Sequence, residues 1–300
     1  MSYSTEVLDL IGNTPLIKLT RFTDMTVYAK AEFLNPGGSI KDRVAKHIIF
    51  EAERSGALGP GVPIVEATSG NTGIGIALVG AQRGHPVKIV MPENMSEERK
   101  KIILALGAEL ILTPAEKGVD EAIRVANEIT AKVNGWRFNQ FDNPLNPETH
   151  YLFTGREIWE SLDGKVHAFV AGVGSGGTLG GVGRFLKERD PSVRIIAVEP
   201  KQTAALLRQE PGLHAIQGIG DGFVPSCLDT HLIDDLLTVS DEDAIATTRL
   251  LARSQGLLVG TSSGANVWAA TFIARALGAT HNVVTVLPDR AERYFSTALI

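Results

Sequence analysis

Short, continuously apolar segments recur along this chain and limit it to a few fold classes. A strand with one face in water alternates apolar and polar residues, whereas a strand covered on both faces is apolar throughout. Segments of the second kind predict strands at Val27–Lys30, Pro63–Glu66, Val87–Met91, Glu109–Leu112, Arg137–Asn139, Ala168–Ala171, Ile195–Glu199, Leu236–Val239 and Val283–Leu287. These are more strands than one sheet usually holds, so two sheets are expected.

Segments with helical character separate the predicted strands, and several of them end at glycine. Helices are predicted over Lys41–Ser55, over Thr72–Arg83, from a Ser96 cap to Gly107, along the apolar stripe Val119–Val133, and from the Ser240–Asp243 capping pair to Arg253. Such alternation predicts an α/β fold with mainly parallel sheets. Because no linker or repeat interrupts the pattern, any two domains should be closely joined.

Composition excludes several classes of function. The 300 residues are 44% hydrophobic, as in ordinary globular proteins, and the net charge of -5 argues against nucleic acid as the main partner. No apolar stretch approaches the ~18 residues of a membrane helix and no signal peptide is recognisable, so a soluble, cytoplasmic protein is expected. The single cysteine, Cys227, allows no internal disulfide, and the histidine spacing indicates no metal site.

The segment Asn35–Arg43 places a lysine directly after a turn of Asn, Pro, Gly and Ser residues. Ser39 is a candidate cap for a helix that begins near Ile40, so Lys41 would lie at a helix start. The positive end of the helix dipole disfavours an ammonium group there and favours the neutral amine. A lysine with a lowered pKa is the nucleophile of Schiff-base chemistry, although a lone lysine is usually an exposed surface residue.

Two further loops join a predicted strand to a helix through small residues. In Thr68–Gly73, backbone N–H groups could cradle a carboxylate or phosphate, or Asn71 could simply cap a helix. In Gly172–Thr178, glycines would let the main chain close on a phosphate. The same loop satisfies the G-x-G-x-x-G pattern at Gly172, Gly174 and Gly177, with Glu199 where a ribose-binding acid of an NAD enzyme belongs.

A third loop, Gly260–Gly264, matches the G-x-S-x-G pattern of serine hydrolases. The chain order required of such an enzyme fails, because no acidic residue lies between Ser262 and His281. The loop is therefore interpreted as a capped turn, whose hydroxyl groups could also bind a ring nitrogen or a phosphate.

Together these segments resemble one family. The motifs of the cysteine synthase (O-acetylserine sulfhydrylase) family, which are fold type II enzymes dependent on pyridoxal 5'-phosphate (PLP), match Asn35–Arg43, Thr68–Gly73, Gly174–Thr178, Gln217–Gly220 and Ser262–Gly264. The resemblance extends from Ile11–Pro15 to Glu292–Thr297, nearly the whole chain.

The resemblance implies a role for each matched residue. Lys41 would be the catalytic residue, which holds PLP as a Schiff base and moves the α-proton of the substrate. The remaining cofactor-binding residues would be Asn71, Gly174, Ser175, Gly176, Gly177, Thr178 and Ser262. The substrate-binding residues would be Thr68, Ser69, Gly70, Asn71, Thr72, Gln140 and Gly218.

The resemblance also implies a tryptophan synthase β-like fold of two closely joined three-layer αβα domains. A smaller, mobile substrate-binding domain would comprise residues 1–13 and 33–145. A larger, PLP-phosphate-binding domain would comprise residues 14–32 and 146–300. A homodimer and an interaction with serine acetyltransferase are expected on the same grounds.

The implied reaction is β-replacement on an activated L-serine, in which O-acetyl-L-serine and sulfide give L-cysteine and acetate through an α-aminoacrylate. Many family members carry a small residue at Asp221, and an acid there should disfavour HS⁻ and could favour homocysteine, unless it points to solvent. A cystathionine β-synthase-like reaction, O-phosphoserine as donor, and an NAD-dependent oxidoreductase of another class remain as alternatives.

Overall fold

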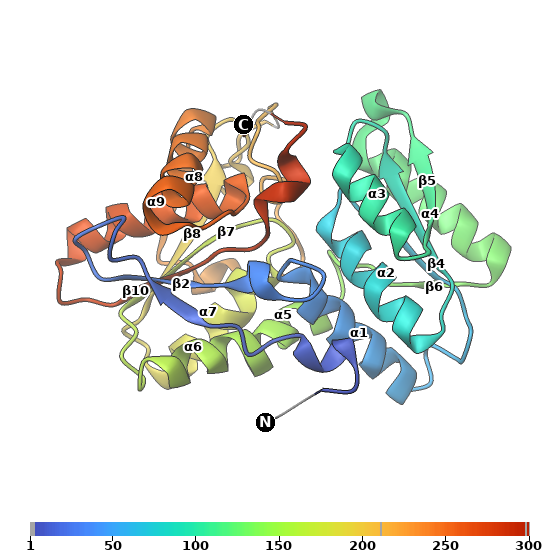
Figure 1. The fold of residues 1–300 in the computed structure, drawn as a ribbon, viewed down its shortest axis with the longest axis horizontal. Helices are drawn as coiled ribbons and strands as arrows, with labels where there is room; N and C mark the ends of the chain where they lie inside the picture. Colours follow the sequence, from blue (N-terminus) through green and yellow to red (C-terminus); the bar gives the residue numbers. More distant parts are fainter. Residues whose placement is uncertain (1–3, 211, 298, 300) are drawn as a thin grey trace.

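Two sheets form the framework of the protein (Figure 1). The computed structural model describes residues 4–210, 212–297 and 299. The six-stranded sheet has the order β1 (Leu16–Lys18), β2 (Val27–Lys30), β10 (Val283–Val286), β7 (Ala168–Gly172), β8 (Arg194–Pro200) and β9 (Asp235–Val239). The four-stranded sheet has the order β5 (Glu109–Thr113), β4 (Val87–Pro92), β3 (Ile64–Ala67) and β6 (Trp136–Arg137). The strand pairs are parallel except β1 and β2, which run antiparallel.

Helices cover both sheets, and each sheet has its own apolar core. The α-helices of the described residues are α1 (Lys41–Arg54), α2 (Asn71–Arg83), α3 (Glu97–Ala105), α4 (Gly118–Val133), α5 (Leu145–Thr149), α6 (Arg156–Ser161), α7 (Gly177–Arg189), α8 (Asp241–Gln255) and α9 (Thr261–Leu277). A π-helical segment joins α5 to α6 at His150–Gly155. Short 3₁₀ helices lie at Val7–Leu10, Glu32–Leu34, Ala115–Lys117, Ala205–Leu207, Thr230–Leu232 and Ala291–Tyr294. In Figure 1, α2, α3 and α4 accompany the smaller sheet, while α7, α8 and α9 accompany the larger. None of the described helices is long and apolar enough to cross a membrane.

The predicted strands are confirmed in position, with two departures. The sequence gives no sign of β1, because this short strand is largely unburied at the edge of its sheet and lacks a continuous apolar run. The strand predicted at Arg137–Asn139 ends at Arg137 instead. The cause is Glu66, whose carboxylate accepts the N–H groups of Asn139 and Gln140 at 2.9 and 3.1 Å and turns the chain away.

The predicted helix starts are confirmed, but two of the predicted caps differ. Ser240 is the N-cap of α8 and accepts the N–H of Asp243 at 3.1 Å, as expected. Ser39 accepts the N–H of Lys41 at 3.2 Å, but it lies one residue before the N-cap of α1, which is Ile40. Ser96 stands at the N-cap of α3, but its hydroxyl is buried and makes no capping bond. The prediction that the Ser96 side chain caps this helix was therefore wrong.

The glycines of α7 allow close helix packing. A Cβ on Gly181 would lie 2.1 Å from the carbonyl oxygen of Pro147, and a Cβ on Gly177 would lie 2.0 Å from Oδ1 of Asn146. Both contacts are shorter than any real Cβ contact, so α7 approaches the backbone of α5 at Gly181 and the side chain of Asn146 at Gly177. This packing brings Asn146 beneath the N-terminus of α7.

The domain ranges predicted from the resemblance stay a prediction. The strands β3 to β6, within residues 33–145, form the smaller sheet, and the other strands form the larger one. Residues 1–3, 211, 298 and 300 of the predicted ranges lie outside the described residues.

Candidate active site

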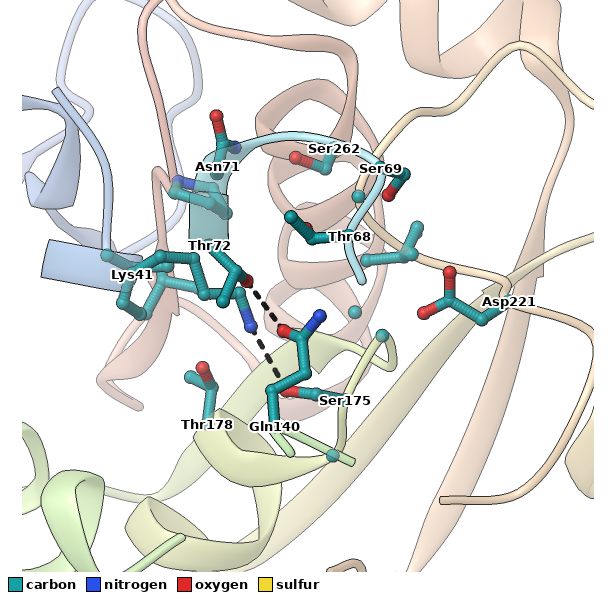
Figure 2. A pocket seen from close by; sticks show the side chains of 18 of the residues that line it. Lys41, Thr68, Ser69, Asn71, Thr72, Gln140, Ser175, Thr178, Asp221 and Ser262 are labelled. Atoms are coloured by element: carbon teal, nitrogen blue, oxygen red, sulfur yellow. Dashed lines mark hydrogen bonds between the residues drawn. The ribbon is translucent and has the colours of Figure 1, made fainter. Parts of the chain in front are cut away.

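A pocket lies where the carboxyl ends of β3, β7 and β10 lead into loops (Figure 2). In parallel α/β sheets, this is the edge at which ligands bind. Most of the residues predicted for the site line it: Lys41, Thr68, Ser69, Asn71, Thr72, Gln140, Gly174, Ser175, Gly176, Thr178, Gly218 and Ser262. Gly70 and Gly177 lie behind this lining, where they allow side chains of Arg99 and Asn146 to approach the backbone.

Lys41 is the first residue of α1, and its amine points into the pocket (Figure 2). The Nζ atom donates a hydrogen bond to Oγ of Ser175, at 3.0 Å. Burial lowers the pKa of Lys41, while the charges of Asp221 and Cys227 oppose that change. A lowered pKa increases the fraction of neutral amine, which is the nucleophilic form.

A buried ionic cluster fixes the helix that carries Lys41. Arg43 bonds Glu32 at 2.7 Å and Glu157 at 2.6 Å, and Lys30 also reaches Glu157, at 2.6 Å. Glu32 is fully buried, which alone would raise its pKa, but the guanidinium of Arg43 lowers the pKa below the ordinary value. The cluster thus joins α1 to β2 and α6.

The turn before Lys41 is held by Asp42. Its carboxylate accepts the N–H of Gly37 at 2.7 Å, and burial raises the pKa of Asp42 to about 7. A Cβ on Gly37 would lie 2.5 Å from that carboxylate. The glycine predicted to shape this loop is therefore required by the close approach of Asp42.

The loop from Gly174 to Thr178 forms a cradle at the N-terminus of α7. Gly176 has φ +78°, and a Cβ there would lie 2.8 Å from the side chain of Leu228. The N-terminus of a helix offers free backbone N–H groups and a positive dipole end. These features fit the phosphate of PLP.

Ser175 is the meeting point of two hydrogen bonds. Its Oγ atom accepts from Nζ of Lys41 and from Nδ2 of Asn146, each at 3.0 Å. Because a hydroxyl oxygen has two lone pairs, these bonds occupy both and leave the hydroxyl hydrogen to be donated elsewhere. Ser175 is thereby prepared as a donor to a phosphate oxygen.

The loop after β3 presents hydroxyl groups at the other side of the pocket. Thr68 Oγ1 accepts the N–H of Gly70 at 3.1 Å, which tightens the turn. Thr72 donates to Oε1 of Gln140 at 2.6 Å (Figure 2), while Glu66 holds the backbone of Gln140. The backbone N–H groups in the first turn of α2 suit a carboxylate.

Asn71 and Ser262 complete the predicted set. Asn71 donates to Oδ2 of Asp289 at 2.6 Å and accepts from Arg293 at 2.6 Å, so its amide group is engaged by the protein. Ser262 is buried in the first turn of α9 and lines the pocket.

Among the residues that the sequence prediction missed are four polar ones that support the site. Asn146 supports Ser175, and His150 lies 3.4 Å from Oγ1 of Thr178. Glu66 holds Gln140, and Arg99 lines the pocket from α3. All four act across long sequence separations.

The structure disfavours two alternative functions. Glu199 is buried, and its carboxylate accepts the N–H of Leu206 at 3.1 Å, so it is not available for a ribose. No histidine is among the described residues that line the pocket with Ser262, which disfavours a hydrolase triad there.

The comparisons with known proteins decide the family. A model of the family described as "Pyridoxal-phosphate dependent enzyme" matches residues 7–289. The chain belongs to this family. It is 46% identical over 297 residues to a cysteine synthase of Staphylococcus aureus, covering 98% of this chain and 96% of the relative.

Solved structures of the family are close in shape. An O-ureido-L-serine synthase superposes with a TM-score of 0.97 at 42% identity, covering 99% of this chain and 95% of the other. An O-acetylserine dependent cystathionine beta-synthase from Helicobacter pylori superposes with a TM-score of 0.94 at 41% identity, covering 100% and 99%. The expected fold type II architecture and the expected cofactor, PLP, are confirmed.

We predict that Asn146→Ala weakens PLP binding by about 5- to 30-fold, equivalent to about 1–2 kcal/mol for a lost buried hydrogen bond. The reason is that Ser175 and the carbonyl of Gln140 both lose their Asn146 donor. The dissociation constant should be measured by titrating the cofactor-free protein with PLP. Asn127→Ala, on the exposed side of α4, is the control. An unchanged dissociation constant in Asn146→Ala would contradict this role.

Proposed function

We propose that the protein is a cysteine synthase, which replaces the acetoxy group on Cβ of O-acetyl-L-serine by sulfide to give L-cysteine and acetate. The observation that carries the proposal is the amine of Lys41 at the mouth of a phosphate cradle, opposite a loop suited to a carboxylate. The family and the 46% identical relative support it.

Each group of the pocket has a task in this reaction. PLP, when bound, supplies an electron sink for the charge that develops on the substrate Cα. Gly174, Ser175, Gly176, Gly177 and Thr178 would hold its phosphate, with Asn71 and Ser262 at its ring. Thr68, Ser69, Gly70, Asn71 and Thr72, with Gln140, would bind the substrate carboxylate, and Gly218 would lie beside the substrate.

Lys41 would anchor the cofactor and then act as a general base. With the cofactor and substrate bound, its Nζ would lie close to Cα as a free amine and could take the α-proton. Its lowered pKa keeps that amine neutral at a lower pH than an exposed lysine would allow. Acetate then leaves from Cβ, and sulfide adds there.

The charges of the pocket favour a donor whose leaving group is uncharged while it is still attached to Cβ, as an acetyl ester is. Besides Lys41, Arg99 is the only cationic side chain among the described lining residues, and both of its Nη atoms already bind protein groups. Asp221 adds a negative charge, and its carboxyl group points into the pocket (Figure 2). A phosphate dianion would lie near this carboxylate without a free cation, so we favour O-acetylserine over O-phosphoserine as donor.

Asp221 is also the residue that would distinguish nucleophiles. Although the residue as a whole is exposed, desolvation by the surrounding protein raises the pKa of its carboxyl, and the amine of Lys41 opposes this. A carboxylate here repels HS⁻ and attracts the ammonium group of homocysteine. We therefore propose homocysteine as a second acceptor, which would give a cystathionine β-synthase-like side activity.

Several wider expectations belong to the same proposal. A homodimer, a complex with serine acetyltransferase and a cytoplasmic location are proposed from the family resemblance. We also propose that a substrate-binding unit, residues 1–13 and 33–145, moves relative to residues 14–32 and 146–300 and closes over the bound amino acid. The reason is that the Thr68–Gly73 loop, which would bind the substrate carboxylate, follows a strand of the smaller sheet.

The proposal predicts that the PLP-loaded protein makes cysteine from O-acetyl-L-serine and sulfide, with a change in cofactor absorption when O-acetylserine is added. Lys41→Ala should lower turnover by at least about 10²- to 10⁴-fold, the usual contribution of a positioned acid–base group. Lys132→Ala, an exposed lysine of α4, is the control. Normal turnover in Lys41→Ala would refute the assignment. A kcat/KM for O-phosphoserine equal to that for O-acetylserine would refute the proposed leaving group.

A second prediction concerns Asp221. Asp221→Ala should lower the ratio of homocysteine to sulfide kcat/KM by about 10-fold, which corresponds to a charge interaction of about 1–2 kcal/mol. Asp221→Asn, which keeps the shape and removes the charge, should behave alike, whereas Asp120→Asn on α4 should not change the ratio. The measurement is steady-state turnover with each acceptor. An unchanged ratio in both Asp221 variants would show that the carboxylate does not select the acceptor.

A further inference from the structure

Arg99 is a buried cation at the edge of the pocket that the proposed mechanism does not use. It lies on α3, has a relative exposure of 2%, and lines the pocket beside Ser69. No carboxylate of the described residues forms an ion pair with it. A buried guanidinium without a carboxylate partner is costly, so its hydrogen bonds should serve a purpose.

The guanidinium joins three segments that are distant in sequence. Its Nη1 atom donates to Oε1 of Gln217, next to Gly218 of the pocket, and lies 3.5 Å from the carbonyl oxygen of Ser69. Its Nη2 atom donates to the hydroxyl of Tyr294 at 2.8 Å. The planar group also lies over the ring of Tyr294, 4.7 Å from its centre.

The turn that would receive the substrate carboxylate is shaped around this side chain. A Cβ on Gly70 would lie 2.5 Å from Nε of Arg99, so the backbone of the turn rests directly on the guanidinium. The Nε atom is buried and has no hydrogen-bond partner. Arg99 therefore supports the Ser69–Gly70 turn directly, at the edge of the pocket.

The contact with Tyr294 extends this support to Asn71. The hydroxyl of Tyr294 donates to Oδ2 of Asp289, and the same oxygen accepts from Nδ2 of Asn71 at 2.6 Å. One chain of bonds thus connects α3, the C-terminal segment and the first residue of α2. Nearby, Glu98 accepts from the hydroxyl of Ser296 at 2.7 Å, so α3 is attached to the C-terminal segment at two places.

We propose that Arg99 is a positioning residue for the amino-acid substrate: it sets the Ser69–Gly70 turn and fixes the Gln217–Gly218 segment across the pocket. The inference rests on the proposed function, because it requires that this turn bind the carboxylate of the substrate. The fork of two Nη groups is essential, since a lysine ammonium on a flexible stem cannot hold two acceptors on different segments in one plane.

The test compares Arg99→Met, Arg99→Lys and Tyr294→Phe with the control Arg124→Met, an exposed arginine of α4 that bonds only Glu121 and Glu128 in the described structure. Arg99→Met should raise the KM for O-acetylserine about 10-fold while kcat changes less than about 3-fold. The dissociation constant of PLP should stay within about 2-fold, because the phosphate cradle lies on α7. Arg99→Lys should retain most of the defect, and Tyr294→Phe should show a smaller one.

A second readout separates positioning from turnover. The affinity for a non-reactive amino acid, L-alanine, measured through the absorption of the bound cofactor, should fall in parallel with the rise in KM. A KM and an L-alanine affinity equal to those of the wild type in Arg99→Met, full rescue by Arg99→Lys, or an equal loss of PLP affinity would each overturn the inference. If the wild-type protein itself lacks β-replacement activity, the proposed function fails, which is a distinguishable result.

Discussion

The burial of one amine, Nζ of Lys41, governs the arrangement of this protein. A lysine is costly to bury, and the cost is met by placing it at a helix start beside Ser175 and lowering its pKa. The helix cannot shift, because Arg43, two residues further on, is bonded to both Glu32 and Glu157 in the interior. Breaking such a buried pair by removing one partner typically costs about 3–5 kcal/mol. Lys41 is therefore held by the ionic cluster behind it as well as by the pocket around it.

The two sheets contribute different halves of the pocket to this amine. The larger sheet supplies the cradle at the start of α7, and the smaller supplies the loop at the start of α2. Both are helix N-termini, which suit the two anionic groups of the proposed reaction, a phosphate and a carboxylate. Close packing of α7 against α5, which Gly177 and Gly181 permit, then brings Asn146 to Ser175.

The elements that local sequence specifies were predictable. Apolar runs indicated the strands, and Gly, Ser and Thr at strand ends indicated the loops that line the pocket. The resemblance of five motifs to those of the cysteine synthase family gave the roles proposed for Lys41 and its neighbours. Ser96 was misjudged because a serine before acidic residues is a good cap in general, yet its hydroxyl here is buried without a partner. The strand β1 carries too few residues to form a pattern.

The supporting residues could not have been found in the same way. Glu66, Asn146 and Arg99 act on groups that lie far away in the chain: Gln140, Ser175 and Tyr294 respectively. No periodicity or spacing in the sequence indicates which residue a buried carboxylate or guanidinium will bind. Only the fold brings the two residues of each pair together. Asp221 was noticed for its charge, but its place in the pocket came from the structure.

The role of Lys41 can be tested by reducing the PLP-loaded protein with borohydride and mapping its peptides. Reduction makes the bond between a lysine amine and the cofactor permanent. We expect the pyridoxyl group on the peptide that contains Lys41 and on no other lysine. Its recovery on a different lysine, Lys30 for example, or the absence of any labelled peptide from protein that retains PLP, would refute the assignment of Lys41.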